Sequence, residues 1–339
     1  MKVIIDDKIP FIRDAAEKMF SNVVYLPGDR ITASDVKDAD ALIIRTRTRC
    51  DQSLLNGSAV RFIVTATIGY DHLDIDYLSK TGITWTNCPG CNASSVGQYI
   101  ESCLILLKRQ KLLPASPVIG IVGLGHVGNQ VAMKVKSLGY KLLFNDPPRQ
   151  EREDEVDFCN MKEIAERCDV ITFHTPLTFT GRYKTWHLAD NGFFNSLERK
   201  PIIINAARGG VVDERELHKA YINGRISAYI LDTWENEPHI AIDVMNDAFI
   251  ATPHIAGYSA DGKCNATKMA LKATCDFFGI KPEFNIMPPL LPNNMVLEGN
   301  KEEQKLQLYN PCIDNDRLKM HPENFEKLRS NYPLRRESW

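Results

Sequence analysis

Short apolar runs alternate with helix-like segments along most of the chain. In the first ninety residues these runs are KVIID, VVYL, ALII, RFIVT and ITWT. The segments between them, such as residues 9–20 and 75–79, have the spacing of amphipathic helices. Such alternation is typical of parallel strands joined by crossover helices. We therefore predict that this part of the chain forms one open α/β layer.

A long helix-like stretch, residues 92–113, follows this layer, with Ser94 or Ser95 as the expected cap near its start. The segment LPASP then interrupts the helical pattern. Six further apolar runs follow: VIGIV, YKLLF, DVITF, PIIIN, ISAYILD and AFIA. Six strands with helices between most of them suit a complete dinucleotide-binding sheet.

The amphipathic segment 260–278 is expected to be a helix that returns to the first layer. The second α/β series, residues 93–257, would then be inserted into a discontinuous domain made of 1–92 and 258–280. The polar residues 281–339 form a separate C-terminal region in this interpretation.

Composition narrows the class of protein. The 339 residues are 44% hydrophobic and 25% charged with a net charge of −2, which argues against a general nucleic-acid surface. No apolar run approaches the roughly 20 residues that span a bilayer, and no signal-peptide pattern is evident. Nine scattered cysteines, an odd number, suggest reduced thiols. We expect a cytoplasmic protein that binds neither nucleic acid nor membrane.

The motif GLGHVG directly follows the apolar run VIGIV and directly precedes a segment with helical spacing. It contains Gly123, Gly125, His126, Val127 and Gly128. Glycines at this spacing allow a tight turn, close approach to a pyrophosphate and close helix–strand packing, and the helix N-terminus then faces the diphosphate. The alternative is a glycine-rich turn without a ligand, and the strand-to-helix context favours the cofactor.

Asp146 ends the next apolar run, eighteen residues beyond Gly128. A carboxylate at this place accepts hydrogen bonds from a ribose diol and repels a 2′-phosphate. The sequence therefore predicts NAD rather than NADP as the cofactor.

Three polar residues follow later strand-like runs and are candidate catalytic groups: Arg208, Glu237 and His254. Arginine is suited to holding a carboxylate by two hydrogen bonds, although a structural salt bridge is the alternative. Histidine titrates near neutrality and can take the hydroxyl proton that hydride transfer releases, although a structural histidine is the alternative. Glu237 would orient His254 if the two side chains meet, which sequence alone does not show.

At this point a family resemblance is clear. VGLGHVG, INAARGGVVDERELHKA, LDTWENEP and TPHIAGYS resemble the NAD-dependent D-2-hydroxyacid dehydrogenases. TATIGYDHLD, PGCNASSVGQYI, NDPPR, FHTPLTFTGRYKTWHLAD and HIAGYSADGK are similar to the members of that family that oxidise 4-phospho-D-erythronate in the vitamin B6 pathway. The resemblance runs from Met1 to about Gly279.

The resemblance implies a fold and an assembly. Residues 93–257 would be a Rossmann-type NAD domain inserted into a flavodoxin-like α/β substrate domain formed by 1–92 and 258–280. Residues 281–339 would be a small dimerisation element, because ENFEKLRSNYPLRRE resembles part of the dimerisation domain of this family. A homodimer is therefore expected, although longer relatives carry a further strand and helix after this segment.

The resemblance also implies the reaction and its residues. The reaction would be NAD-dependent oxidation of 4-phospho-D-erythronate to (R)-3-hydroxy-2-oxo-4-phosphooxybutanoate. Arg208 would bind the C1 carboxylate and polarise the C2 oxygen, and His254 would be the acid–base group paired with Glu237. The implied cofactor contacts are Gly123, Gly125, His126, Val127, Gly128, Asp146, Thr175, Ala206, Ala207, Arg208, Asp232 and Gly257. The implied substrate contacts are Thr46, Thr67 and Tyr258, and no metal is expected.

The segment RTRTR places Arg45, Arg47 and Arg49 two residues apart directly after the run ALII. Residues at this spacing share one face of a strand, but they diverge if the chain turns after Arg45. We expect at least one of them, Arg47 above all, to hold the terminal phosphate of the substrate. The alternative is a solvated basic edge or salt bridges to Asp40 and Asp51.

Several alternatives stay open. The substrate could be that of another D-2-hydroxyacid dehydrogenase, such as 3-phosphoglycerate, and a non-catalytic NAD-sensing protein could use the same fold. The CPGC segment, Cys88 to Cys91, is interpreted as a structural turn rather than a redox or zinc site. Lys184 and His187 lie either near the site or on a surface loop.

Overall fold

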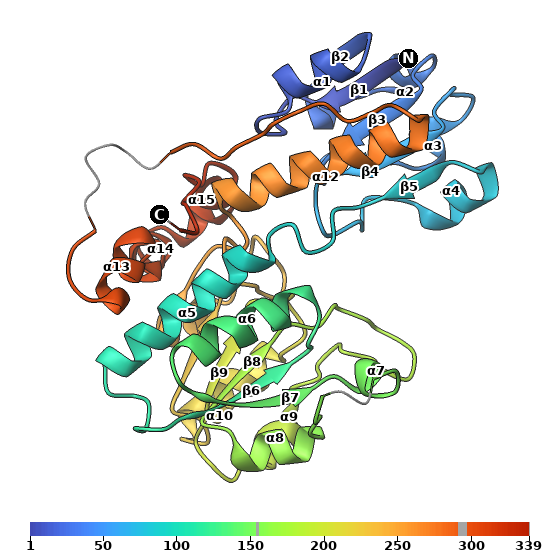
Figure 1. Ribbon diagram of the computed structural model, residues 1–339. Helices are drawn as coiled ribbons and strands as arrows, with labels where there is room; N and C mark the ends of the chain where they lie inside the picture. Colours follow the sequence, from blue (N-terminus) through green and yellow to red (C-terminus); the bar gives the residue numbers. More distant parts are fainter. Residues whose placement is uncertain (154–155, 291–296, 339) are drawn as a thin grey trace. The chain divides into compact units, whose positions relative to one another are not determined.

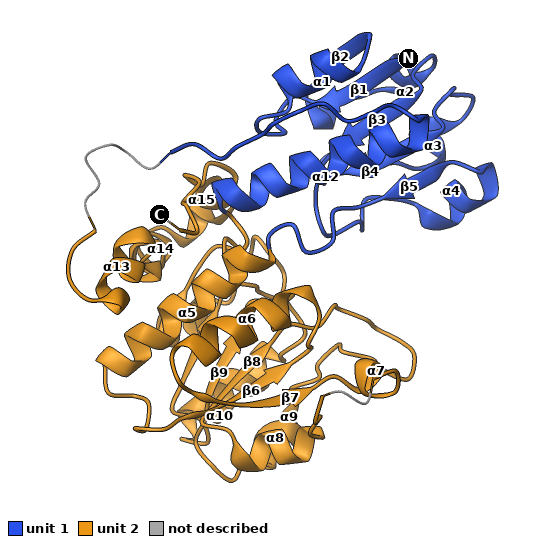
Figure 2. Ribbon diagram, in the orientation of Figure 1, with its two compact units in different colours: residues 1–92, 259–291 blue, residues 93–258, 292–339 orange. Residues whose placement is uncertain are grey.

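The protein contains two parallel β-sheets, each within its own compact unit. The computed structural model describes residues 1–153, 156–290 and 297–338. Unit 1 comprises Met1–Asn92 and Ser259–Leu291, and unit 2 comprises Ala93–Tyr258 and Pro292–Trp339 (Figure 2). The predicted α/β architecture is confirmed.

Unit 1 contains a five-stranded parallel sheet in the order β2-β1-β3-β4-β5. This is the strand order of flavodoxin-like folds. Its strands are β1 (Lys2–Asp6), β2 (Asn22–Leu26), β3 (Ala41–Ile44), β4 (Phe62–Thr65) and β5 (Thr84–Thr86). Its helices are α1 (Arg13–Met19), η1 (Gly28–Arg30), α2 (Ala33–Val36), α3 (Gln52–Leu55), α4 (Ile75–Thr81) and α12 (Ala260–Phe278).

Helices cover both faces of this sheet (Figure 1). α1 and α12 pack on one face, and α2, α3 and α4 contribute apolar side chains to the core on the other. β3 and β4 are buried along their whole length, which explains why their sequences are nearly continuous apolar runs. α12 has the bounds that the sequence predicted for the returning helix.

Unit 2 contains a six-stranded parallel sheet in the order β11-β10-β9-β8-β6-β7. The six strands that the sequence predicted are all present: β6 (Val118–Val122), β7 (Lys141–Asn145), β8 (Val170–Phe173), β9 (Ile202–Asn205), β10 (Ala228–Leu231) and β11 (Ile250–Ala251). The helices up to residue 258 are α5 (Ala93–Arg109), α6 (His126–Ser137), α7 (Pro147–Gln150), α8 (Met161–Arg167), α9 (Asn191–Asn195), α10 (Glu214–Ile222) and α11 (Ile242–Asp247). The strand order reverses beside β6, so ligands are expected at the carboxyl ends there.

The long helix α5 starts differently from the prediction. It begins at Ala93, so Ser94 and Ser95 lie inside its first turn and neither is the cap. Ser95 is buried, and its hydroxyl donates a hydrogen bond to Glu337 at 2.7 Å. The predicted serine cap is wrong because the helix begins before both serines, and the Ser95 hydroxyl bonds Glu337 of a distant segment.

The predicted C-terminal region 281–339 is divided between the units: residues 281–290 belong to unit 1, and the described part from residue 297 onward belongs to unit 2. The part in unit 2 forms α13 (Lys301–Leu308), α14 (Pro311–Met320), η2 (Pro322–Asn324) and α15 (Phe325–Ser330). Leu318 and Phe325 are buried in the unit 2 core, and the Ala251 N–H of β11 donates to Asn315 Oδ1 at 2.9 Å. Residues 291–296 and 339 of the predicted region lie outside the described residues. Its role in dimerisation stays a prediction.

The cysteines are free thiols, most of them buried. All nine cysteines are free, and eight of them are buried. Cys88 donates to the Ala266 carbonyl at 3.3 Å, and burial raises the pKa of its thiol to about 12, which favours the structural interpretation of CPGC. Among the helices that the structure describes, none combines the length and the apolar character needed to cross a bilayer.

The RTRTR segment does not continue β3. The strand ends at Ile44, and the chain turns so that the Thr48 N–H donates to the Arg45 carbonyl at 3.2 Å. The Thr48 hydroxyl is buried and donates to the Gly28 carbonyl at 2.8 Å. Of the two alternatives that the sequence left open, the structure shows the second: the chain turns after Arg45, so the three arginines do not share one strand face.

Arg45 and Arg49 form ion pairs of different kinds. Arg45 donates to the fully buried carboxylate of Asp6 through Nε at 3.1 Å and through Nη2 at 3.3 Å. Arg49 pairs with Asp51 at 2.9 Å while its side chain is 80% exposed. Arg49 therefore forms the salt bridge to Asp51 that the sequence had left open. Arg47, which lies between them in the sequence, is also exposed.

Replacement of these two arginines should affect stability unequally. Arg45→Met leaves the buried Asp6 carboxylate without its cation and should lower the free energy of unfolding by about 2 kcal/mol, less than for a fully buried pair because Arg45 is partly exposed. Arg49→Met should change it by less than about 0.5 kcal/mol, since its pair is solvated. Urea unfolding of both variants measures the difference, and equal losses would contradict this account.

Candidate active site

The predicted site residues of unit 2 gather at one edge of its sheet. Arg208 follows β9, Glu237 follows β10 and His254 follows β11. These three strands are neighbours and run parallel, so their carboxyl ends lie at the same edge. The glycine loop after β6 and Asp146 after β7 belong to this edge as well.

His254 and Glu237 meet. The His254 Nδ1 atom lies 2.8 Å from Glu237 Oε2 and 3.1 Å from Oε1. Burial of Glu237 by itself raises the pKa of its carboxyl. The hydrogen bond and charge of His254, the Trp234 N–H and the charge of Arg329 outweigh burial and lower this pKa. The ionised carboxylate holds Nδ1, so Nε2 is the nitrogen left for proton transfer.

Asp232 fixes the turn that carries His254. Its buried carboxylate accepts hydrogen bonds from the Thr252 hydroxyl at 2.7 Å, the Ile255 N–H at 2.8 Å and the Ala256 N–H at 2.9 Å. His254 has a φ of +56°, which is uncommon for a residue with a side chain and needs such support. The sequence had suggested only a cofactor contact for Asp232, and this supporting role was missed.

Arg208 is available to a ligand. Its Nη1 donates to the Ala207 carbonyl at 2.8 Å, and no carboxylate pairs with it in the part of the chain that the structure describes. A Cβ on Gly209 would lie 1.9 Å from the Trp234 carbonyl oxygen, so only glycine allows the Arg208 loop to pack this closely on the loop of Glu237. The structural salt bridge left open by the sequence is not observed.

The glycine loop has the shape that a dinucleotide needs. A Cβ on Gly128 would lie 2.0 Å from the Gly123 carbonyl oxygen, so the third glycine allows the helix to approach the strand. Gly125 caps α6 without any side-chain hydrogen bond, and a Cβ there would meet no atom within 4 Å. The first turn of α6 therefore has no capping side chain, and its N–H groups suit a diphosphate.

Asp146 and Thr175 stand on either side of this loop in the sheet order. Asp146 accepts from the Leu124 N–H at 2.8 Å and from the Arg149 N–H at 3.0 Å, which fixes the glycine loop and leaves further lone pairs. The buried Thr175 hydroxyl has no hydrogen-bond partner among the described residues, which suits a ligand contact. Three other predicted cofactor contacts follow strands of the same sheet: Ala206, Ala207 and Gly257.

The predicted substrate contacts are divided between the units. Thr46, Arg47 and Thr67 belong to unit 1, where they follow the neighbouring strands β3 and β4, and Tyr258 belongs to unit 2. Thr46 and Arg47 are exposed. The Thr67 hydroxyl is half-buried and donates to the Gly69 carbonyl at 2.9 Å.

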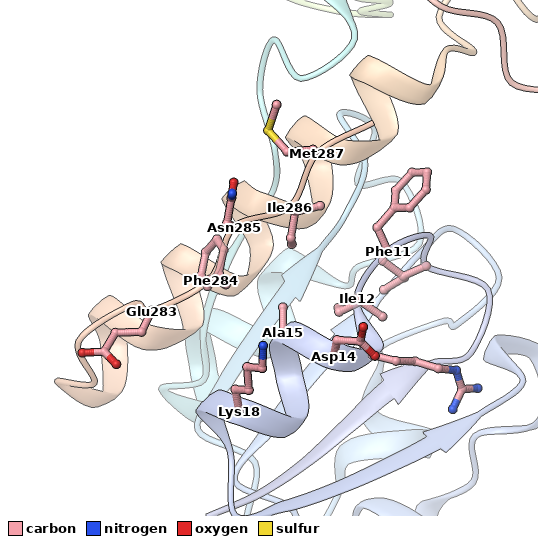
Figure 3. Close-up of a pocket in the computed structure, with 12 residues that line it drawn as sticks. Phe11, Ile12, Asp14, Ala15, Lys18, Glu283, Phe284, Asn285, Ile286 and Met287 are labelled. Atoms are coloured by element: carbon pink, nitrogen blue, oxygen red, sulfur yellow. The ribbon is translucent and has the colours of Figure 1, made fainter. Parts of the chain in front are cut away.

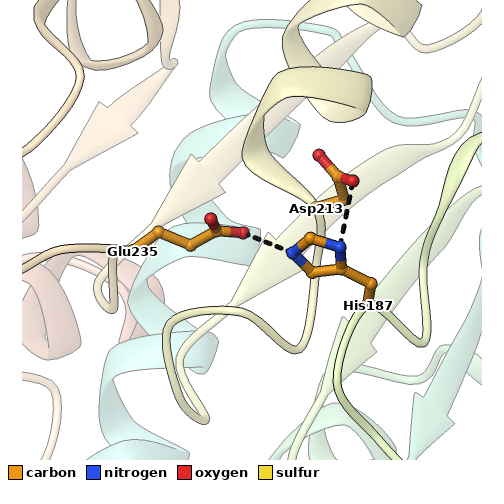
Figure 4. A group of neighbouring side chains, drawn as sticks. All are labelled: His187, Asp213 and Glu235. Carbon is orange, nitrogen blue, oxygen red and sulfur yellow. Dashed lines mark hydrogen bonds and ion pairs between the residues drawn. The ribbon is translucent and has the colours of Figure 1, made fainter.

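His187 lies between two carboxylates rather than on a free loop (Figure 4). Its Nδ1 is 3.1 Å from Asp213 Oδ2 and its Nε2 is 2.9 Å from Glu235 Oε1. Among the described residues, these three side chains form the group whose potential metal-ligating atoms lie close together. The two ring nitrogens point in opposite directions, so the geometry is that of a hydrogen-bonded bridge rather than of one shared ion. Lys184 is exposed.

Glu214 is a buried carboxyl beside this bridge. It accepts a hydrogen bond from the Glu235 N–H. Burial and the nearby charges of Glu235, Glu237 and Asp213 raise the pKa of Glu214 to about 8, so it is protonated at neutral pH. The sequence missed it because an acid in the first turn of α10, directly after the cap Asp213, is an ordinary helix signal.

Two cavities are found among the described residues, one in each unit. One of about 510 Å³ lies in unit 1 between α1, the turn before it and the extended segment 283–287 (Figure 3). None of the predicted site residues lines it. Another of about 300 Å³ lies in unit 2, lined by Pro253 and by residues of the C-terminal helices and the segment after them. Neither contains a predicted catalytic residue.

Known proteins share these features. Residues 108–256 match the family described as D-isomer specific 2-hydroxyacid dehydrogenase, NAD binding domain. The chain is 52% identical over 338 residues to erythronate-4-phosphate dehydrogenase of Bacteroides fragilis, covering 99% of this chain and 97% of the relative. The identity to the enzyme of that name from Porphyromonas gingivalis is 37% over 346 residues, covering 99% and 94%.

Solved structures agree with the fold. The NAD-bound 3-phosphoglycerate dehydrogenase of Entamoeba histolytica superposes with a TM-score of 0.66 at 26% identity, covering 82% of this chain and 95% of that chain. Together with the NAD-binding family match, this confirms the predicted fold class and the predicted cofactor, NAD. The chain belongs to the erythronate-4-phosphate dehydrogenases, within the D-isomer-specific 2-hydroxyacid dehydrogenase family.

Proposed function

We propose that this protein oxidises 4-phospho-D-erythronate with NAD to (R)-3-hydroxy-2-oxo-4-phosphooxybutanoate, in the biosynthesis of pyridoxal 5′-phosphate. The observation that carries the proposal is the 2.8 Å contact between His254 Nδ1 and Glu237, at the sheet edge that also bears Arg208 and the glycine loop. The names of the full-length relatives supply the substrate.

His254 acts as the base in the proposed reaction. The hydrogen on C2 leaves as hydride, taking both electrons of the C2–H bond. The C2–O bond becomes double, and the hydroxyl proton passes to Nε2 of His254. Glu237 stabilises the imidazolium that forms, because its carboxylate already accepts the Nδ1 hydrogen bond. Bound NAD supplies the hydride acceptor.

Arg208 binds the substrate at its acid end. Its guanidinium holds the C1 carboxylate by two hydrogen bonds and draws electron density from the C2 oxygen. The absence of an ion pair to Arg208 among the described residues supports this role, since the charge is not already neutralised. Gly209 keeps this arginine beside the loop of Glu237.

The cofactor would be held by backbone and side chains of unit 2. The diphosphate faces the first N–H groups of α6, and Asp146 accepts from the adenosine ribose. The Thr175 hydroxyl gains the hydrogen-bond partner that it lacks within the described protein. The remaining contacts would come from His126, Val127, Ala206, Ala207, Asp232 and Gly257.

The first test compares substrates. We expect the purified protein with NAD to oxidise 4-phospho-D-erythronate with a kcat/KM about 100-fold or more above that for D-erythronate and D-lactate, because the phosphate supplies charged contacts that these acids lack. Formation of reduced nicotinamide is followed by absorbance, with a 2-oxo acid present in parallel to unload tightly held cofactor. Preference for 3-phospho-D-glycerate would support the other dehydrogenase, and NAD binding without turnover would support a sensing protein.

The second test concerns Arg47. We propose that this exposed arginine after β3 holds the terminal phosphate, so Arg47→Ala should raise the KM for 4-phospho-D-erythronate about tenfold, the size of one lost charge-assisted hydrogen bond. Arg49→Ala is the matched control, because it removes an exposed arginine from the same segment. An unchanged KM in Arg47→Ala would exclude this residue from phosphate binding.

We also propose that the protein is a cytoplasmic homodimer. Ile313 and Met320 lie seven residues apart on one face of α14 and are 54% and 66% exposed, which supports an apolar interface. The free cysteines support a reducing compartment. Light scattering at micromolar concentration should give twice the mass of the chain, and the double variant Ile313→Glu with Met320→Glu should give the mass of one chain. A single-chain mass for the unaltered protein would contradict the dimer.

A further inference from the structure

An arginine from the C-terminal region contacts the acid–base pair. Arg329 of α15 places Nη1 3.4 Å from Glu237 Oε2, the oxygen that lies 2.8 Å from His254 Nδ1. Arg329 also forms a side-chain hydrogen bond with Tyr258, the predicted substrate contact of unit 2. One guanidinium therefore touches two groups of the predicted site.

We propose that Arg329 is a positioning residue for the acid–base pair. Its side chain contacts the same Glu237 carboxylate as His254, and its fixed positive charge thereby sets how strongly His254 holds its proton. The inference rests on the proposed role of His254 as the base. It adds a fourth residue, contributed by a segment for which the sequence suggested only dimerisation.

The segment that carries Arg329 is anchored at the same loop. Phe325, at the start of α15, is buried in the unit 2 core. After the helix, the buried Arg335 donates to the carbonyls of Ile255 at 3.0 Å, Ala256 at 2.6 Å and Tyr258 at 2.9 Å. Because both sides of Arg329 are fixed, its contact with Glu237 is not that of a mobile surface side chain.

The charges around the pair give the direction of the effect. Burial alone would lower the pKa of Arg329, but Tyr258, Glu237 and Glu326 raise it, so this cation persists at any working pH. A permanent cation beside Glu237 disfavours a second positive charge on His254.

Other ionisable groups face the pair from the remaining elements. Asp232 lies behind His254 after β10, and the largely protonated Glu214 lies near Glu237 at the start of α10. Neither supplies a positive charge. Arg208 is a cation at the same sheet edge, but its hydrogen bond goes to the Ala207 carbonyl. Arg329 contacts Glu237 itself, so removal of Arg329 should make His254 more basic.

The test measures the His254 ring directly. The imidazole resonances of the full-length protein are titrated by NMR without substrate, and a His254→Gln spectrum assigns the His254 signal. Arg329→Gln should raise the pKa of His254 by about half a pH unit or more, as expected for loss of one partly exposed charge close by. Arg329→Lys, which keeps the charge, should restore most of the original value.

Controls separate this effect from loosening of the helix. Lys327→Met removes a positive charge from an exposed position of α15 and should leave the pKa of His254 unchanged. Arg329→Met is a second neutral variant in case Arg329→Gln does not fold, as judged by circular dichroism. A pKa of His254 that is unchanged or lowered in a folded neutral variant would overturn the proposal.

A kinetic measurement links the effect to turnover. Since His254 must be neutral to take the proton, the acid limb of kcat/KM for oxidation should move to higher pH in Arg329→Gln by the same amount as the NMR titration shows. A limb that does not move would overturn the role in catalysis. If no substrate turns over, the proposed function fails, while the NMR titration still tests the charge coupling by itself.

Discussion

The site depends on one constraint, which is that the strands of unit 2 are all parallel. Parallel strands end at a common edge, so residues far apart in the chain, from Gly123 to His254, are delivered to the same place. The contact between Glu237 and His254 arises in this way, because β10 and β11 are neighbours with aligned ends. Helices on both faces bury the strands and leave that edge as the place for polar side chains.

Much of the fold could be predicted because buried parallel strands are continuous apolar runs, and all six in unit 2 were visible in the sequence. The errors involve contacts between distant segments. Ser95 does not cap α5 because its hydroxyl bonds Glu337, more than 200 residues away. Whether the arginines of RTRTR share a strand face was left open by the sequence, and it is decided by Thr48, whose hydroxyl donates to the Gly28 carbonyl. Neither partner is implied by local spacing.

The same division holds for the site. Arg208, Glu237 and His254 could be proposed from their residue types and from their positions after strands. Asp232 and Arg329 could not, because the roles inferred for them depend on which loop packs beside them. An aspartate after a strand and an arginine in a late polar helix have many structural uses, and only the folded chain distinguishes these.

The close packing of Gly209 on the Trp234 carbonyl has a consequence for selectivity. It joins the loop of Arg208, the proposed carboxylate-binding residue, to the loop of Glu237, which in turn hydrogen-bonds His254, so the two loops are held together. In the proposed reaction this packing therefore fixes the spacing between the group that binds the carboxylate and the group that accepts the proton. A fixed spacing of this kind would favour a hydroxyl on the carbon next to the carboxylate over a hydroxyl further along the substrate.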